Sequence, residues 1–297
     1  MPLPREIEAF YTTPGPMTAL GPHAAAVAAL PRDLAGVCGA VQGDMVHFHW
    51  AEAYGLTMPP ERGAQQHLRT VRASLDVLGA GAPLDRRREP NDRVVGVCRH
   101  FAVLTTAILR AQGVPARSRT GFGAYFEAGK FVDHWVVEYW NREQERWVLV
   151  DSQLDALQAA ALKLDFDPKD TPRDRFIIAG DAWKQCRAGK ADPMAFGIFD
   201  MWGLWFIGGN VVRDAASLNN MEMLPWDVWG ATPQPTPPLD ADALAFIDRL
   251  ADLTMDADAR FDELRAVYEQ DARLRVPREV FNALTSRSEP VVEAIAA

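Results

Sequence analysis

Apolar side chains recur with helical spacing in some segments of this chain and gather into strand-like runs in others. Apolar residues spaced three or four positions apart predict a helix over residues 61–78: Leu68, Val71, Leu75 and Leu78. A second stripe predicts a helix from about Cys98 to Gln112, which Gly113 ends. After residue 239, two further amphipathic stretches predict two helices near the C-terminus.

Two runs rich in β-branched and aromatic residues, 131–140 and 146–151, predict strands. The segment between them predicts an antiparallel hairpin with a four-residue loop at 141–144. In that register Trp140 faces Glu145, and counting outward places His134 opposite Asp151. Directly opposed residues share a face of the sheet, so a carboxylate would lie beside an imidazole.

The pattern also predicts how the chain divides. Residues 1–230 form one domain, in which the segment 196–230 is rich in tryptophan. The Pro-rich stretch 231–239 reads as a linker, and 240–297 as a helical C-terminal segment.

Composition narrows the class of protein. The chain has 297 residues and a formal net charge of -9, which argues against nucleic acid or an anionic membrane as a partner. The most apolar later run, Phe196 to Ile207, is too short to span a bilayer. We read no secretory signal at the N-terminus, so the expected location is cytoplasmic. Three widely spaced cysteines form neither a disulfide framework nor a C-x-x-C pair.

One of these cysteines stands where a nucleophile could be activated. Cys98 begins the second predicted helix, and a helix N-terminus favours a thiolate. His134 and Asp151, on the predicted hairpin, would supply the base and the group that orients it. Each residue also has an ordinary interpretation: a core cysteine, a structural histidine and an aspartate that ends a strand. Only the combination indicates catalysis.

Three segments resemble a known family. GVCRHFAVLTTAILRAQGVPAR (96–117) is similar to the nucleophile helix of the transglutaminase-like superfamily, DHWVVEYW (133–140) to its histidine strand, and RWVLVDSQ (146–153) to the strand that ends at its aspartate. The resemblance, centred on residues 90–155, implies an α+β, papain-like fold with Cys98, His134 and Asp151 as a catalytic triad. Ser152 departs from the pattern, since many members have proline there.

The resemblance implies acyl transfer through a thioester on Cys98. The expected substrate is a peptide, a protein or a small amide, with no cofactor. Hydrolysis is favoured over transfer to an amine, because nothing in the sequence marks an amine site. The Cys98 N–H would stabilise the oxyanion. The second donor is left open among four upstream residues: His49, Trp50, Gln65 and Gln66. The oligomeric state is also left open.

Competing interpretations concern the aromatic and charged residues. The tryptophan-rich block is either core or a wall that binds substrate, and we take Trp135, Trp202 and Trp205 as candidate substrate contacts. The whole chain could instead be a non-catalytic scaffold, or a metal hydrolase that uses histidines such as His47 and His49, although no specific ligand spacing supports a metal. Remaining expectations are an Arg213–Asp214 ion pair, a solvated loop at Arg86–Arg88, and inert Cys38 and Cys186.

Overall fold

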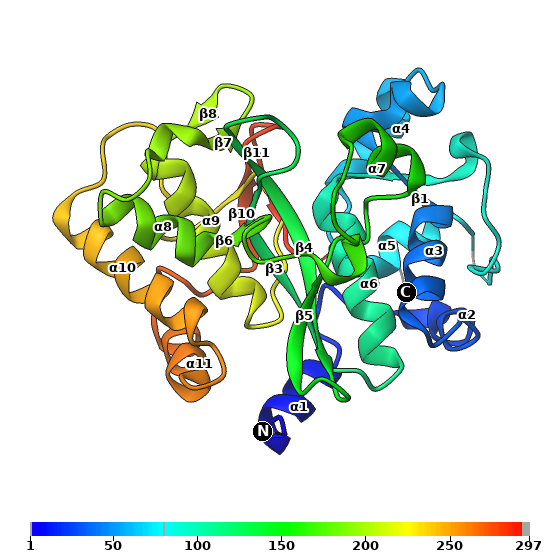
Figure 1. Ribbon diagram of the computed structural model, residues 1–297, viewed down its shortest axis with the longest axis horizontal. Helices are drawn as coiled ribbons and strands as arrows, with labels where there is room; N and C mark the ends of the chain where they lie inside the picture. The colour runs from blue at the N-terminus through cyan, green and yellow to red at the C-terminus, as the bar shows by residue number, and fades with distance from the viewer. Residues whose placement is uncertain (1, 80, 293–297) are drawn as a thin grey trace. The chain divides into compact units, whose positions relative to one another are not determined.

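The computed structural model describes residues 2–79 and 81–292 and has the α+β composition that the sequence predicts (Figure 1). The chain divides into two units. Unit 1 consists of Met1–Ser118 and Val136–Thr171, and unit 2 of Arg119–Trp135 and Pro172–Ala297. In this division the C-terminal helices fall in the same unit as the tryptophan-rich segment. The domain boundaries read from the sequence at residues 231–239 stay a prediction.

Unit 1 is built around α6 (Cys98–Ala111), which confirms the second predicted helix. Every residue from Cys98 to Arg110 is buried, because helices pack against α6 on several sides. Gly113 then adopts a φ of 76°, the left-handed conformation that commonly ends a helix. The helices that pack against α6 are α1 (Arg5–Thr12), α2 (Ala24–Ala28), α3 (Leu34–Asp44) and α5 (Val71–Asp76).

The helix predicted over 61–78 is wrong as a single element. The segment instead forms α4 (Pro60–Gly63), a 3₁₀ turn at Ala64–His67, and α5. Leu68 and Thr70 have extended backbone conformations that interrupt the helix. The Oγ1 of Thr70 accepts a hydrogen bond from the Ala73 N–H at 3.1 Å, so Thr70 acts as a new N-cap. Apolar periodicity therefore identified two buried residues of α5, Val71 and Leu75, but not the break before the helix.

The predicted hairpin is present, but its register is shifted. β4 (Phe131–Asn141) pairs antiparallel with β5 (Arg146–Val150), and Asn141 faces Arg146. The Oδ1 of Asn141 accepts hydrogen bonds from the N–H groups of Glu143 and Gln144, both at 3.0 Å, so the loop begins one residue later than predicted. The pairing of His134 with Asp151 derived from the predicted register is therefore wrong. The shift is two residues, so each ladder residue keeps its face.

Short elements complete unit 1. The parallel pair β1 (Met45–His47) and β2 (Val94–Gly96) leads into α6, and α7 (Ala156–Leu162) follows β5. The loop around Arg86–Arg88 is not uniformly solvated, which corrects the prediction: the Arg88 guanidinium pairs with the buried Asp44 at the end of α3.

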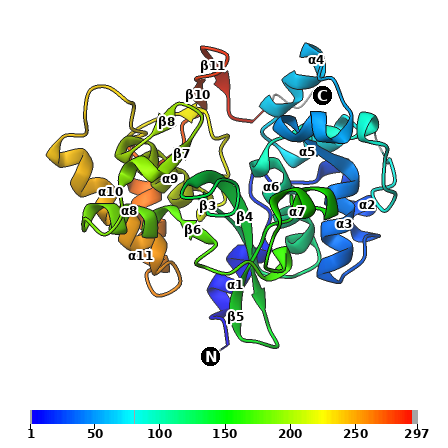
Figure 2. The same cartoon turned by 45° about the horizontal axis from the view of Figure 1, so that its top comes forward.

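Unit 2 combines helices with the remaining strands. α8 (Ala179–Arg187), α9 (Leu204–Ser217) and α10 (Ala241–Met255) pack on one another, as Figures 1 and 2 show. The two helices predicted near the C-terminus are confirmed as α10 and α11 (Phe261–Gln270).

A six-stranded sheet has the order β6-β3-β4-β7-β8, with β5 paired to β4. A separate sheet has the order β11-β10-β9. The strands not yet described are β3 (Ala116–Gly123), β6 (Phe176–Ile178), β7 (Phe196–Ile198), β8 (Met201–Trp202), β9 (Asp227–Val228), β10 (Glu279–Asn282) and β11 (Arg287–Pro290).

The predicted Arg213–Asp214 ion pair is wrong. Asp214 accepts hydrogen bonds from Nε and Nη2 of Arg119 at 3.0 and 2.8 Å, whereas Arg213 donates to the Asp227 carbonyl at 3.3 Å. Consecutive helix residues project about 100° apart, so Arg213 and Asp214 meet different neighbours. The buried Arg119–Asp214 pair joins β3 to α9 inside unit 2.

Candidate active site

Cys98 is the first residue of α6, as the sequence predicts. The preceding Val97 is extended, and its N–H donates to Nδ1 of His100 at 3.2 Å, which holds the entry to the helix. N–H groups in the first turn of a helix lack intrahelical acceptors, so they are free to donate to a group placed beyond the N-terminal end of the helix. The Cys98 side chain is buried at 7% exposure. This is the placement that suits a thiolate and an oxyanion.

Asp151 directly follows the end of β5 and is 1% exposed. Its N–H donates to the Pro168 carbonyl at 2.8 Å, and its Oδ1 accepts from the Gln153 N–H at 3.2 Å. Because its backbone and its carboxylate both make hydrogen bonds within unit 1, Asp151 is held as a fixed acceptor.

Ser152 connects the Asp151 segment to the helix that carries Cys98. Its Oγ accepts from Thr105 Oγ1 at 2.8 Å and donates to the Phe101 carbonyl at 3.3 Å, and both partners belong to α6. Gln42 of α3 donates to the Ser152 carbonyl at 3.2 Å. The sequence marked Ser152 only as a departure from the family pattern, whereas this residue fixes two candidate catalytic residues of unit 1 to one framework.

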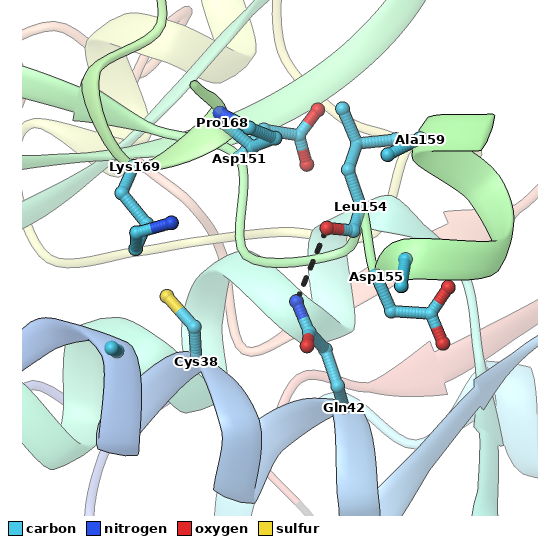
Figure 3. Close-up of a pocket in the computed structure, with 10 residues that line it drawn as sticks. Cys38, Gln42, Asp151, Leu154, Asp155, Ala159, Pro168 and Lys169 are labelled. Carbon is cyan, nitrogen blue, oxygen red and sulfur yellow. Dashed lines mark hydrogen bonds between the residues drawn. The ribbon is translucent and has the colours of Figure 1, made fainter. Parts of the chain in front are cut away.

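A cavity of about 280 Å³ in unit 1 borders Asp151 (Figure 3). Cys38 of α3 points its sulfur toward Lys169 across this cavity, and Gln42 donates to the Leu154 carbonyl at 3.3 Å along its wall. The Lys169 ammonium pairs with Asp167 at 2.8 Å. Burial raises the pKa of the Cys38 thiol to about 12, so this sulfur stays protonated at neutral pH.

Cys186 of α8 resembles Cys38 in this respect. Burial raises the pKa of its thiol to about 11, with a smaller contribution from the charge of Asp192. Neither Cys38 nor Cys186 is suited to act as a nucleophile at neutral pH.

His134 lies on β4 within unit 2 and is 2% exposed. Its ring makes edge-to-face contacts with three aromatic rings, with centroid distances of 4.8 Å to Phe126, 6.0 Å to Tyr125 and 6.3 Å to Phe176. Cys98 and Asp151 belong to unit 1, and the meeting of all three residues stays a prediction.

Asp133, next to His134, belongs to a buried polar cluster of unit 2. Asn210 of α9 donates to its Oδ1 at 2.6 Å. Burial raises the pKa of Asp133, an effect that the nearby Arg213 charge opposes. This cluster holds the beginning of β4 against α9.

The three tryptophans predicted as substrate contacts differ in exposure. Trp135 is 1% exposed and fully enclosed, while Trp202 and Trp205 are partly exposed. The indole N–H of Trp202 donates to the Phe199 carbonyl at 2.6 Å, and the Lys130 ammonium lies 4.6 Å from the centroid of its ring. Both features make Trp202 part of the local structure; substrate contact by these residues stays a prediction.

Two of the four residues considered as the second oxyanion donor, Gln65 and His49, make hydrogen bonds within unit 1. Gln65 Oε1 accepts a hydrogen bond from the Val95 N–H of β2 at 2.8 Å, so this amide supports the strand that leads to Cys98. His47 Nδ1 accepts from the His49 N–H at 3.2 Å. Burial lowers the pKa of His49. Within residues 2–79 and 81–292, no group of three His, Cys, Asp or Glu side chains is arranged to hold a metal ion.

Sequence reasoning missed Tyr125 and Phe126, which contact His134. Their signal was visible as an aromatic pair in the turn between the strands, one residue after the Gly-Phe-Gly that ends β3. No helix among the described residues has both the length and the apolar character that a membrane span requires.

Comparison with protein-family models supports the resemblance to the transglutaminase-like superfamily over one region of the chain. Residues 49–152 match the family model of the transglutaminase-like superfamily. No match was found among the curated proteins.

Two solved structures are similar to parts of the chain. A transglutaminase from red sea bream is 19% identical with a TM-score of 0.28, and the match covers 41% of this chain and 22% of that one. A protein from Cytophaga hutchinsonii described as a "putative cysteine protease" is 17% identical with a TM-score of 0.20, covering 51% of this chain and 47% of that one. The chain thus corresponds to less than half the length of either protein.

Proposed function

Since the chain carries a transglutaminase-like core over residues 49–152, we propose that it is a thiol enzyme that forms a thioester on Cys98 and breaks an amide bond. The observation that carries this proposal is the position of Cys98 as the first residue of α6, inside the matched region. Asp151, which Ser152 ties to the same helix, supports it.

In the proposed reaction the Cys98 thiolate attacks the amide carbonyl and forms a C–S bond. His134, protonated, gives its proton to the leaving nitrogen as the C–N bond breaks, and the amine departs. Water then attacks the thioester and loses a proton to His134, and the acid leaves as the thiolate is regenerated. Asp151 is proposed to hold the imidazole in the tautomer that this sequence needs.

Selective alkylation tests the proposal. At about pH 6.5, iodoacetamide should modify Cys98 at least about tenfold faster than Cys38 or Cys186, because only a thiolate reacts quickly. The raised thiol pKa of Cys38 and Cys186 makes them internal controls. Peptide mass spectrometry after brief labelling gives the three rates, and His134→Ala should slow only that of Cys98.

Two other outcomes would favour the competing functions. Equal labelling of the three cysteines would contradict a catalytic thiol and favour a non-catalytic scaffold. Amide hydrolysis that survives Cys98→Ala but is lost with a chelator would instead indicate a metal hydrolase that uses histidines.

A further inference from the structure

The loop between β3 and β4 carries two aromatic side chains against the proposed base. Tyr125 and Phe126 pair with each other, with ring centroids 4.5 Å apart, and both contact the His134 ring. His134 and the third neighbour, Phe176, are almost fully buried, whereas Tyr125 and Phe126 are only partly buried. The loop aromatics therefore supply the solvent-accessible aromatic surface next to the imidazole.

The sequence makes room for this arrangement at Gly123. A Cβ built on Gly123 would lie 2.7 Å from an atom of the Phe126 ring and 2.9 Å from an atom of the Tyr125 ring. Only glycine lets both rings approach the end of β3 this closely.

Both ends of the loop are fixed to neighbouring elements of unit 2. The Ala124 N–H donates to the Arg175 carbonyl at 2.8 Å, and Lys130 Nζ donates to the Met194 carbonyl at 3.1 Å. Gly129, with a φ of 78°, makes the return turn. The two rings are thus presented by an anchored loop, which suits a surface that selects among ligands.

We propose that Tyr125 and Phe126 form the subsite for the amine portion of the substrate and select amines that carry an apolar or aromatic group. This inference rests on the proposed function. When His134 gives its proton to the leaving nitrogen, that nitrogen lies within hydrogen-bond reach of the ring. The group attached to the nitrogen would then lie beside the imidazole, where Tyr125 and Phe126 are partly exposed aromatic side chains in contact with the ring. A planar apolar group gains most from such a wall.

The reverse of amine departure, in which an amine attacks the Cys98 thioester, allows this selectivity among amines to be measured as a ratio of rates. An amine that attacks the Cys98 thioester forms a new C–N bond, loses a proton to His134 and displaces the sulfur, so it occupies the same subsite. p-Nitrophenyl acetate serves as the acyl donor: its carbonyl accepts Cys98, p-nitrophenolate leaves, and an acetyl thioester remains. The probes are 2-phenylethylamine and ethylamine, which differ by one phenyl ring.

In the wild-type protein the acetyl-enzyme should react with 2-phenylethylamine about tenfold faster than with ethylamine. Phe126→Ala and Tyr125→Ala should each reduce that preference several-fold, because each should slow the reaction with 2-phenylethylamine more than the reaction with ethylamine. Phe126→Leu, which keeps apolar volume, should retain an intermediate preference. Phe281→Ala, an exposed phenylalanine on β10 of the same unit, is the matched control and should behave as wild type.

The outcomes separate failure of the subsite from failure of the function. Acetylation of Cys98 with no preference between the amines, or with the same preference in the Phe126 and Tyr125 variants, would overturn the subsite and leave the thiol enzyme standing. A parallel loss with both amines in folded variants would show that the rings only support His134, which also overturns it. A wild-type protein that neither carries an acetyl mass on Cys98 nor releases p-nitrophenolate faster than Cys98→Ala would overturn the proposed function and the subsite with it.

Discussion

His100 occupies the third position of α6, two residues after the proposed nucleophile, and is buried at 3% exposure. Its Nδ1 accepts from the Val97 N–H at 3.2 Å, so the proton of the neutral ring lies on Nε2, which meets the Leu68 carbonyl at 2.9 Å. Burial lowers the pKa of His100 to about 3, and the neighbouring Arg99 charge contributes in the same direction. The imidazole is therefore a neutral structural link between α6 and the segment before α5.

This link predicts a stability that depends on pH. An unfolded histidine takes up a proton below about pH 6.5, whereas folded His100 does not until the pH approaches its lowered value. The contribution of His100 to stability is fully present above about pH 6.5 and is lost as the pH falls from there toward about 3. The free energy of unfolding should thus lose about 2 kcal/mol between pH 7 and pH 5 from this residue.

Urea unfolding of the wild type and of His100→Gln at several pH values measures this contribution. Glutamine at the same position cannot titrate, so the difference in stability between the two proteins should shrink as the pH falls. A difference that stays constant from pH 7 to pH 5 would contradict a neutral buried imidazole at this position.

At the scale of elements, the Ser152 hydroxyl determines how the end of β5 meets α6. Thr105 donates to it at 2.8 Å in a buried site, where Thr105 is 0% and Ser152 2% exposed. Removing one partner of a buried hydrogen bond leaves the other unsatisfied, at a cost of about 1–3 kcal/mol. Removing both at once avoids that cost.

A double-mutant cycle tests this tie. Ser152→Ala should lower the free energy of unfolding by about 1–3 kcal/mol, and Thr105→Val combined with it should cost less than the sum of the single changes. Ser74→Ala is the matched control, because Ser74 is also buried in unit 1 but donates to the Thr70 carbonyl at 3.2 Å. Its effect should add to that of Thr105→Val. Strict additivity for Ser152 would contradict the tie.

Helices and strands were the features that the sequence predicted best, although not their exact pairing. The apolar stripe of α6, with Gly113 beyond it, was sufficient to place the helix and Cys98 at its start. The hairpin was predictable as an element, but its register depended on the side chain of Asn141, which closes the loop through its own hydrogen bonds. Local side-chain bonds of this kind compete with strand pairing and leave no periodic signal.

Ion pairs were harder to predict than elements for a related reason. Arg213 and Asp214 are adjacent in sequence, yet Asp214 pairs with Arg119, which lies in a different element. A partner so distant along the chain depends on the packed fold. The contacts of Tyr125 and Phe126 with His134 likewise depend on the fold, so the sequence alone did not identify them.

At the scale of the whole molecule, neither unit is one continuous stretch of chain, so each depends on contacts between distant segments. In unit 2 one polar contact of this kind centres on Asp214, which is 0% exposed. It binds Arg119 and the Thr120 N–H of β3 from its position on α9, and Arg119 also donates to the Thr254 carbonyl of α10 at 3.0 Å. One carboxylate thus joins β3 to α9 directly and to α10 through Arg119.

Asp214→Ala should therefore destabilise unit 2 severely, by about 3–5 kcal/mol, because it leaves the Arg119 charge buried without its partner. Hydrogen exchange followed by mass spectrometry should show faster exchange in peptides from β3 and α9. The matched control is Asp252→Ala, which removes an exposed pair with Lys184 of α8 and should cost less than about 1 kcal/mol. Replacing both partners, as in Arg119→Met with Asp214→Leu, should recover part of the loss, since the uncompensated charge is then gone. Equal exchange in the wild type and Asp214→Ala would show that packing of α8, α9 and α10 alone holds β3 in place.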